Sequence, residues 1–151
     1  HLNPIYGIGG KKRKDVVLKL SEAMKTTSIM DYGCGKGTLA ANLPFPIWEY
    51  DPAISGKDGV PRPADIVVCF DVLQYVEPEM LDNVLGDLVR CSKVCVFAII
   101  DTEGGEGHLI HKDKDWWGVK LNEFFKIGTM IQSGPELHCV LEPRKMGPKA
   151  G

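Results

Sequence analysis

Apolar positions recur along the chain with two different periods. Apolar side chains spaced three and four residues apart indicate helices over 13–25, 36–43, 77–91 and 113–125. Short apolar runs rich in β-branched residues indicate strands over 27–31, 47–50, 66–70, 94–100, 127–132 and 137–142. Residues 133–136, between the last two strands, have the composition of a hairpin turn. Helices and strands that alternate and close with a hairpin predict an α/β sandwich around a mostly parallel sheet.

Length and composition favour one globular domain. The chain has 151 residues, 44% of them hydrophobic and 25% charged. No apolar run approaches the ~18 residues of a membrane span, so we expect no membrane segment. We expect a single domain over 1–145 and a flexible tail over 146–151. The net charge of −2 gives no basic excess, so a nucleic-acid partner is not favoured, and the basic cluster over 11–14 is interpreted as a solvated helix start.

The cysteines indicate reduced thiols. There are five, an odd number, and no two form a C-x-x-C pair. Cys69, Cys95 and Cys139 lie in apolar strand segments, where cysteine behaves as a small buried hydrophobe. We therefore expect a cytoplasmic protein without disulfides and without a metal site.

The segment with the clearest chemical signal is 31–40, DYGCGKGTLA, where a predicted strand ends in an acidic residue, glycines alternate and a helix begins. Glycines at such a bend let the backbone turn sharply and let a ligand approach it closely. A dinucleotide fingerprint would need glycine where Thr38 stands. A Walker loop would need Ser or Thr after Lys36, and Gly37 stands there instead. The pattern that fits is D-x-G-x-G-x-G.

This pattern resembles the first motif of the class I S-adenosylmethionine-dependent methyltransferases. Residues 49–51 (EYD) resemble the end of that family's second strand, and residues 64–76 (ADIVVCFDVLQYV) resemble its fourth-strand segment. The resemblance covers 27–142 and implies a Rossmann-like, three-layer fold. A narrower similarity, carried by DYGCGKG, YDPAI, DVLQYVEPE and the later HLI and WW, is to small methyltransferase-like proteins encoded by bacteriophages.

The resemblance implies S-adenosylmethionine as the cofactor. Asp51 would accept hydrogen bonds from the ribose hydroxyls, and Asp31 would order the glycine loop. Apart from the resemblance, Tyr6 is followed by flexible glycines and would fold over the bound cofactor as a lid. The full set of predicted cofactor-binding residues is Tyr6, Asp31, Gly33, Cys34, Gly35, Gly37, Asp51, Pro52, Asp71, Val72 and Leu73.

One departure from the family pattern concerns the sheet. Only residues 52–64 lie between Asp51 and Asp65, and they are rich in proline and glycine. A helical crossover alone needs about a dozen residues, so a third strand with two helices does not fit. In the family's strand numbering we expect a trimmed sheet of order 2-1-4-5-7-6, with an irregular link in place of the third strand. The family's adenine-binding acidic residue then has only Asp58 as a candidate.

Two residues are candidates for catalysis. Asp71 follows a buried strand, and it either orients or deprotonates the acceptor or holds its loop by backbone hydrogen bonds. His108 follows a glycine-rich loop, where it would act as a general base or simply form hydrogen bonds at a polar loop tip. The apolar pair 109–110 would anchor it. His138 is expected to be structural, and Trp116, off the apolar stripe of its helix, could face a ligand.

These observations predict an S-adenosylmethionine-dependent methyltransferase that acts on an O or N nucleophile. The acceptor would be a small molecule or a protein side chain, and the oligomeric state is not indicated. The alternative is a non-catalytic module that binds S-adenosylmethionine or S-adenosylhomocysteine and acts through protein partners. A nucleotide-dependent oxidoreductase is disfavoured by the failed dinucleotide spacing.

Overall fold

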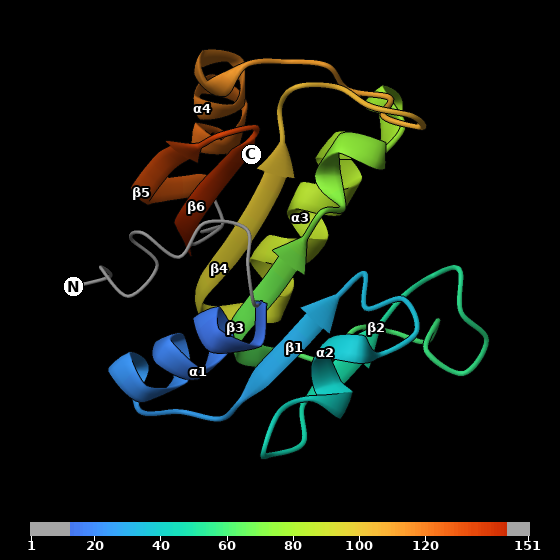
Figure 1. Ribbon diagram of the computed structural model, residues 1–151, viewed down its shortest axis with the longest axis vertical. Helices are drawn as coiled ribbons and strands as arrows, with labels where there is room; N and C mark the ends of the chain where they lie inside the picture. Colours follow the sequence, from blue (N-terminus) through green and yellow to red (C-terminus); the bar gives the residue numbers. More distant parts are fainter. Residues whose placement is uncertain (1–12, 145–151) are drawn as a thin grey trace.

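The computed structural model describes residues 13–144, which form one mixed sheet with helices on both faces (Figure 1). Along the chain the helices and strands are α1 (Arg13–Met24), β1 (Ile29–Tyr32), α2 (Thr38–Ala41), β2 (Trp48–Tyr50), β3 (Ala64–Phe70), α3 (Leu81–Cys91), β4 (Ser92–Asp101), α4 (Lys114–Asn122), β5 (Phe125–Ser133) and β6 (Glu136–Pro143). Their order and type are those that the sequence predicts. Tyr6 and the tail over 146–151 lie outside the described residues.

The strands lie in the order β2-β1-β3-β4-β6-β5. Strands β2, β1, β3 and β4 pair in parallel, whereas β6 is antiparallel to both β4 and β5. If an absent third strand is counted, this order becomes 2-1-4-5-7-6, so the prediction of a trimmed sheet is confirmed. Residues 51–63, which join β2 to β3, contain no helix or strand.

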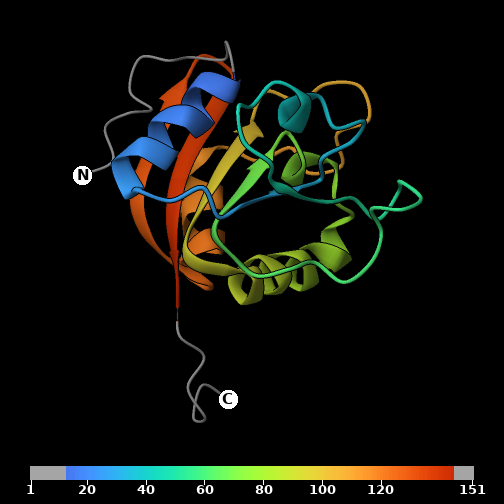
Figure 2. The ribbon, with the colours of Figure 1, turned by 90° about the horizontal axis from the view of Figure 1, so that it is seen from below.

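Helices cover both faces of the sheet, as the turned view shows (Figure 2). On one face α1 packs through Val16, Val17 and Leu20, and α2 lies beside it through Leu39. The other face carries α3 and α4, whose buried apolar side chains are Leu81, Leu85, Leu88, Trp117 and Leu121. None of the helices within residues 13–144 is long and apolar enough to cross a lipid bilayer.

Strand β3 shows why the sequence forms this sandwich. Ile66 and Val68 contact the core beneath α1, while Val67 and Cys69 contact the core beneath α3. A strand buried on both faces reads as a continuous apolar run, as expected for the centre of a parallel sheet. The strand cysteines are buried as predicted, and all five cysteines are free.

Three helices are shorter than predicted by more than one residue. The helix predicted over 77–91 begins as α3 only at Leu81, after a 3-10 turn over Pro78–Met80. The structure ends α4 at Asn122, and Phe125 instead begins β5 with a fully buried side chain. The Asp113 carboxylate caps α4 by accepting a hydrogen bond from the Trp116 N–H (2.9 Å). Helix α2 begins only at Thr38, because Gly37 before it has a left-handed backbone (φ 85°).

We predict that Leu20→Ala lowers the free energy of unfolding by about 2–5 kcal/mol, because the change leaves a cavity between α1 and the sheet. Leu20 is fully buried, whereas its neighbour Lys19 is exposed. The matched control is Lys19→Ala, whose free energy of unfolding should stay within about 0.5 kcal/mol of wild type. Urea unfolding of the wild type and the two variants measures this difference. Equal losses in the two variants would contradict the packing of α1.

Candidate functional site

A cavity of about 510 Å³ opens where the parallel strands end. It lies between the first turn of α1, the glycine loop (residues 33–37), α2 and the end of β3. Its lining residues are Arg13, Lys14, Asp31, Gly33, Cys34, Thr38, Leu39, Asn42, Phe70 and Asp71. The carboxyl ends of parallel strands are where open α/β sheets bind ligands. We call this space the site cavity.

The glycine loop is fixed by the end of β2. The Tyr50 carbonyl accepts hydrogen bonds from the N–H groups of Gly33 (2.7 Å) and Cys34 (3.1 Å). Gly33 has a φ of 86°, and a Cβ there would collide with Cγ2 of Val72. Glycine is therefore required at position 33 by the protein itself, because the loop passes directly over the segment that follows β3.

Asp51 holds the same loop from below. Its Oδ2 accepts a hydrogen bond from the Gly35 N–H (2.8 Å), and its Oδ1 accepts one from the Ala53 N–H (2.9 Å). Both carboxylate oxygens thus already serve the backbone, which is the role of a strand-end cap. Any contact with ribose hydroxyls would use the remaining lone pairs of these oxygens.

Asp31 is a buried carboxylate on the wall of the site cavity, with 5% of its surface exposed. Burial raises its pKa to about 7, and the negative charges of Glu49 and Asp51 add to the effect, while Lys57 opposes it. Asp31 and Glu49 are register partners on adjacent parallel strands, so their side chains lie on the same face of the sheet. The charge of Asp31 therefore changes near neutral pH.

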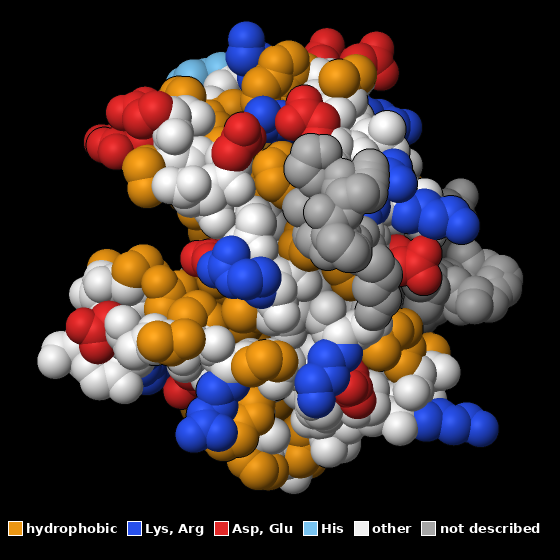
Figure 3. Space-filling model, turned by 180° about the vertical axis from the view of Figure 1, so that it is seen from behind, with side chains coloured by type: hydrophobic (Ala, Val, Ile, Leu, Met, Phe, Trp, Pro, Cys, Tyr) orange, Lys and Arg blue, Asp and Glu red, His pale blue; other side chains and the backbone are white. Residues whose placement is uncertain are grey.

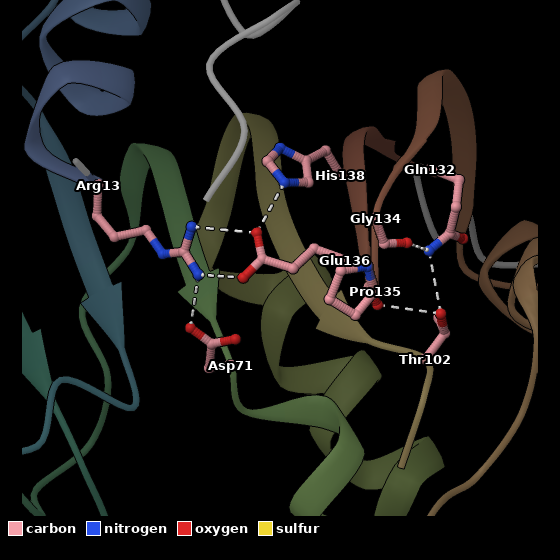
Figure 4. Close-up of polar contacts among 8 residues, drawn as sticks. All are labelled: Arg13, Asp71, Thr102, Gln132, Gly134, Pro135, Glu136 and His138. Carbon is pink, nitrogen blue, oxygen red and sulfur yellow. Dashed lines mark hydrogen bonds and ion pairs between the residues drawn. The ribbon is translucent and has the colours of Figure 1, made fainter. Parts of the chain in front are cut away.

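Arg13 joins Asp71 to Glu136 at the rim of the site cavity (Figure 4). Its Nη2 donates to Oδ2 of Asp71 (2.9 Å) and to Oε2 of Glu136 (2.8 Å). His138 Nε2 lies 3.2 Å from Oε1 of Glu136. Burial by itself would raise the pKa of Glu136, but the hydrogen bonds with Arg13 and His138 lower it below its ordinary value. The Asp71 carboxylate is thus oriented by an ion pair.

The antiparallel strand β6 brings Glu136 to this position. Glu136 pairs with Asp101 at the end of β4, so the first residue of β6 lies at the edge where the parallel strands end. Beside it, the Thr102 N–H (2.8 Å) and hydroxyl (3.1 Å) both donate to the Pro135 carbonyl, and Gln132 Nε2 donates to Thr102 Oγ1 (3.1 Å) (Figure 4). These bonds fix the hairpin turn next to the site cavity.

Arg13 and Glu136 were missed by the sequence analysis. The basic cluster is a helix start as predicted, since α1 begins at Arg13 and Lys14 is exposed, but the Arg13 side chain is only 23% exposed rather than freely solvated. Lys11 and Lys12 lie outside the described residues. Its two carboxylate partners lie 58 and 123 residues away along the chain, so no local pattern signals the contact.

His108 is not among the residues that line the site cavity. Its ring packs edge-on against Tyr75 with a centroid separation of 4.7 Å, and its buried Nδ1 has no hydrogen-bond partner among residues 13–144. The N–H groups of Leu109 and Ile110 donate to the Gln74 carbonyl (2.8 and 3.1 Å). Ile110 is buried, as expected of an anchor, whereas Leu109 is 49% exposed.

Among the remaining predicted residues only Cys34 lies in the wall of the site cavity, whereas Gly35, Gly37, Pro52 and Leu73 do not. Gly35 and Gly37 belong to the same loop, and Pro52 is exposed at the start of the link. Leu73 is fully buried in the core beneath α3. Cys34 is in the wall, but burial, followed by the negative charge of Glu49, raises the pKa of its thiol to about 11. The thiol therefore stays protonated at neutral pH and is a poor nucleophile.

The described residues form no group of three or more His, Cys, Asp or Glu side chains that could hold a metal ion. His138 is buried in β6 and contacts Glu136, in keeping with the structural role expected of it. Trp116 is partly buried and packs edge-on against Trp117 at 5.1 Å, away from the site cavity.

Solved structures of similar fold include several methyltransferases. No protein-family model matches the chain, and no curated protein matches it. The methyltransferase domain of bacterial CtHen1 gives a TM-score of 0.60 at 14% identity, covering 86% of this chain and 97% of that domain. Magnesium protoporphyrin IX methyltransferase (ChlM) from Synechocystis PCC 6803, with bound S-adenosylhomocysteine, gives a TM-score of 0.59 at 16% identity. The match covers 87% of this chain and 82% of that chain. The mitomycin 7-O-methyltransferase MmcR gives a TM-score of 0.57 at 11% identity, and the match covers 87% of this chain and 56% of that chain.

At these identities the likeness concerns the fold. The chain has the Rossmann-like α/β fold of these methyltransferases, with the third strand absent. The predicted fold class is thereby confirmed over most of the chain.

We predict that Asp31→Asn changes how stability depends on pH. The folded protein holds the Asp31 proton more tightly than the unfolded chain, so the stability that this proton confers is complete below about pH 4. It is lost as pH rises through about 7, by about 1.4 kcal/mol for each unit of pKa difference. Urea unfolding between pH 4.5 and 8 should show the wild type losing stability relative to the variant. A difference in free energy of unfolding between wild type and variant that stays constant over this pH range would contradict the prediction.

Proposed function

We propose that this protein is an S-adenosylmethionine-dependent methyltransferase that transfers a methyl group to an O or N nucleophile of its acceptor. The observation that carries the proposal is the site cavity, where a buried carboxylate and a glycine loop meet at the carboxyl ends of β1 and β3. Support comes from solved methyltransferases of the same fold, one with bound S-adenosylhomocysteine and another determination with bound S-adenosylmethionine.

The residues present fit such a cofactor. The site cavity, about 510 Å³, is within the roughly 300–1,000 Å³ usual for small-molecule sites. The buried Asp31 carboxylate favours a ligand that carries positive charge, because a cation would relieve the repulsion from Glu49 and Asp51. The bound cofactor supplies a methyl group on a positively charged sulfur. We propose that Asp31 pairs with the ammonium group of the cofactor. The rest of the cofactor would lie against the glycine loop at Gly33 and Gly35.

Asp71 is the residue that we assign to the acceptor. Arg13 holds its carboxylate at the rim of the site cavity, and 43% of the side chain remains exposed. One oxygen accepts the Arg13 hydrogen bond, so the other can accept a hydrogen bond from an acceptor hydroxyl or amine. Such a contact would orient the nucleophile and take up its proton. His108, packed on Tyr75, would act from the neighbouring loop as a second base.

A small molecule or a protein side chain is the acceptor that we favour. The net charge is −2, and on the face seen in Figure 3 basic side chains are scattered among acidic and hydrophobic ones. A nucleic-acid acceptor usually requires a continuous basic surface.

A non-catalytic cofactor-binding module is the second candidate. The Arg13 ion pair of Asp71 favours it, because this pair already occupies one oxygen of the carboxylate that would serve the acceptor. Asp58, the candidate for contacting adenine, is exposed in the link. An enzyme forms S-adenosylhomocysteine when an acceptor is supplied, and Asp71→Asn should slow that turnover without abolishing cofactor binding. A module forms none with any acceptor.

We predict that Gly35→Val abolishes binding of S-adenosylhomocysteine in isothermal titration, while Gly134→Val leaves it unchanged. The two glycines are matched, with φ of 57° and 58°, and a Cβ at either meets no protein atom within 4 Å. Backbone strain of about 1–3 kcal/mol is therefore common to both variants. Only Gly35 lies in the glycine loop, where a side chain would meet the ligand. Retained affinity in Gly35→Val would overturn the cofactor assignment.

The affinity of the wild type for S-adenosylhomocysteine should also depend on pH. The ligand ammonium would bind ionised Asp31, whose pKa is about 7 in the free protein. Affinity should thus weaken below pH 7, approaching about tenfold per pH unit. Asp31→Asn should bind more weakly and show no such dependence between pH 5.5 and 8. An equally steep profile in the variant would exclude Asp31 as the titrating group.

A further inference from the structure

The link between β2 and β3 places one lysine next to the glycine loop. The Asp51 N–H donates to the Lys57 carbonyl (2.8 Å), and the Lys57 N–H donates to the Ile54 carbonyl (2.9 Å). These bonds fold the first part of the link back onto the end of β2. Lys57 is therefore fixed by its backbone, although no regular element surrounds it.

The side chain of Lys57 pairs with Glu49 on β2. Its Nζ lies 3.3 Å from Oε1 of Glu49, and the two side chains are 27% and 22% exposed. The other oxygen of Glu49, Oε2, is buried and has no hydrogen-bond partner among residues 13–144. A carboxylate in this position depends on its one cation, because an unpaired charge away from water is costly.

Gly37 lies directly over this ion pair. A Cβ at Gly37 would stand 2.7 Å from Oε2 of Glu49 and 2.9 Å from Nζ of Lys57. The last glycine of the loop thus rests on the pair, and the position of the pair determines how far the loop can descend toward β2.

Lys57 also balances the charges beneath the loop. Glu49 and Asp51 both raise the pKa of Asp31, whereas Lys57 lowers it. Without the ammonium, three carboxylates would repel one another at the ends of two adjacent strands, and the loop above them would lose its support.

We propose that Lys57 is a positioning residue for cofactor binding: its ion pair with Glu49 beneath Gly37 supports the glycine loop in place of the absent third strand. The proposal rests on the proposed function, because it assigns the pair a task in holding the same ligand. Lys57 acts through Glu49 and the loop and makes no contact with the ligand itself.

The test is isothermal titration of S-adenosylhomocysteine into the full chain and its variants. Lys57→Met should weaken binding about tenfold, between the effects typical of exposed and of buried ion pairs. Lys57→Arg, which keeps the charge, should stay within about threefold of wild type. Lys93→Met is the control, since Lys93 is exposed at the amino end of β4, whereas the site cavity lies where the parallel strands have their carboxyl ends.

The double variant Glu49→Gln/Lys57→Met distinguishes support of the loop from direct contact. Removing both charges should recover most of the affinity lost in Lys57→Met, because the Glu49 carboxylate is then no longer left without its cation beneath Gly37. The pH below which binding weakens should also move upward in Lys57→Met and return in the double variant. Thermal unfolding of each variant verifies that it is folded.

The outcomes separate the two proposals. If the wild type binds S-adenosylhomocysteine and Lys57→Met binds it with the same affinity, the role of Lys57 is overturned and the proposed function stays intact. Weakened binding that Glu49→Gln fails to recover would mean that Lys57 contacts the ligand directly, which also overturns the positioning role. No binding by the wild type would overturn the proposed function and, with it, this inference.

Discussion

The hydrogen bonds between the end of β2 and the glycine loop fix the geometry on which the site depends. The Tyr50 carbonyl accepts hydrogen bonds from two N–H groups of the loop, and the Asp51 carboxylate accepts a third from the Gly35 N–H. These contacts are possible because β1 and β2 are parallel and remain in register as far as Tyr32 and Tyr50. The loop must then turn toward α2, which leaves the site cavity open beside Asp31.

The same parallel arrangement creates an electrostatic problem. Strands that end at one edge bring their terminal side chains together, and here Asp31, Glu49 and Asp51 are all acidic. Lys57 compensates part of this charge, and Asp31 can retain its proton near neutral pH. The remaining imbalance favours a cationic ligand, because such a ligand supplies positive charge beside Asp31. Loop geometry and charge thus favour the same class of ligand.

Arg13 connects this region to the antiparallel half of the sheet. It joins the first turn of α1 to Asp71 at the end of β3 and to Glu136 at the start of β6. Asp71 has a left-handed backbone, with φ of 61°, which is unusual for a residue other than glycine. Its N–H bond to the Ile99 carbonyl (2.9 Å) and its ion pair with Arg13 hold it in that conformation. The hairpin β5–β6 therefore contributes to the site as well as to the core.

The sequence by itself determined the order of helices and strands, the trimmed sheet and the glycine loop, because apolar periodicity and glycine spacing are local properties of the chain. It indicated that Asp31 and Asp71 lie at strand ends. Only the tertiary structure decided which charges meet. Arg13 finds Glu136 across 123 residues, and Lys57 reaches Glu49 from a link without regular structure. Such contacts depend on strand register and chain reversal, which a linear pattern does not encode. The structure also placed His108 against Tyr75 rather than in the cavity wall, because the Gln74 carbonyl, together with the buried Ile110, fixes that loop.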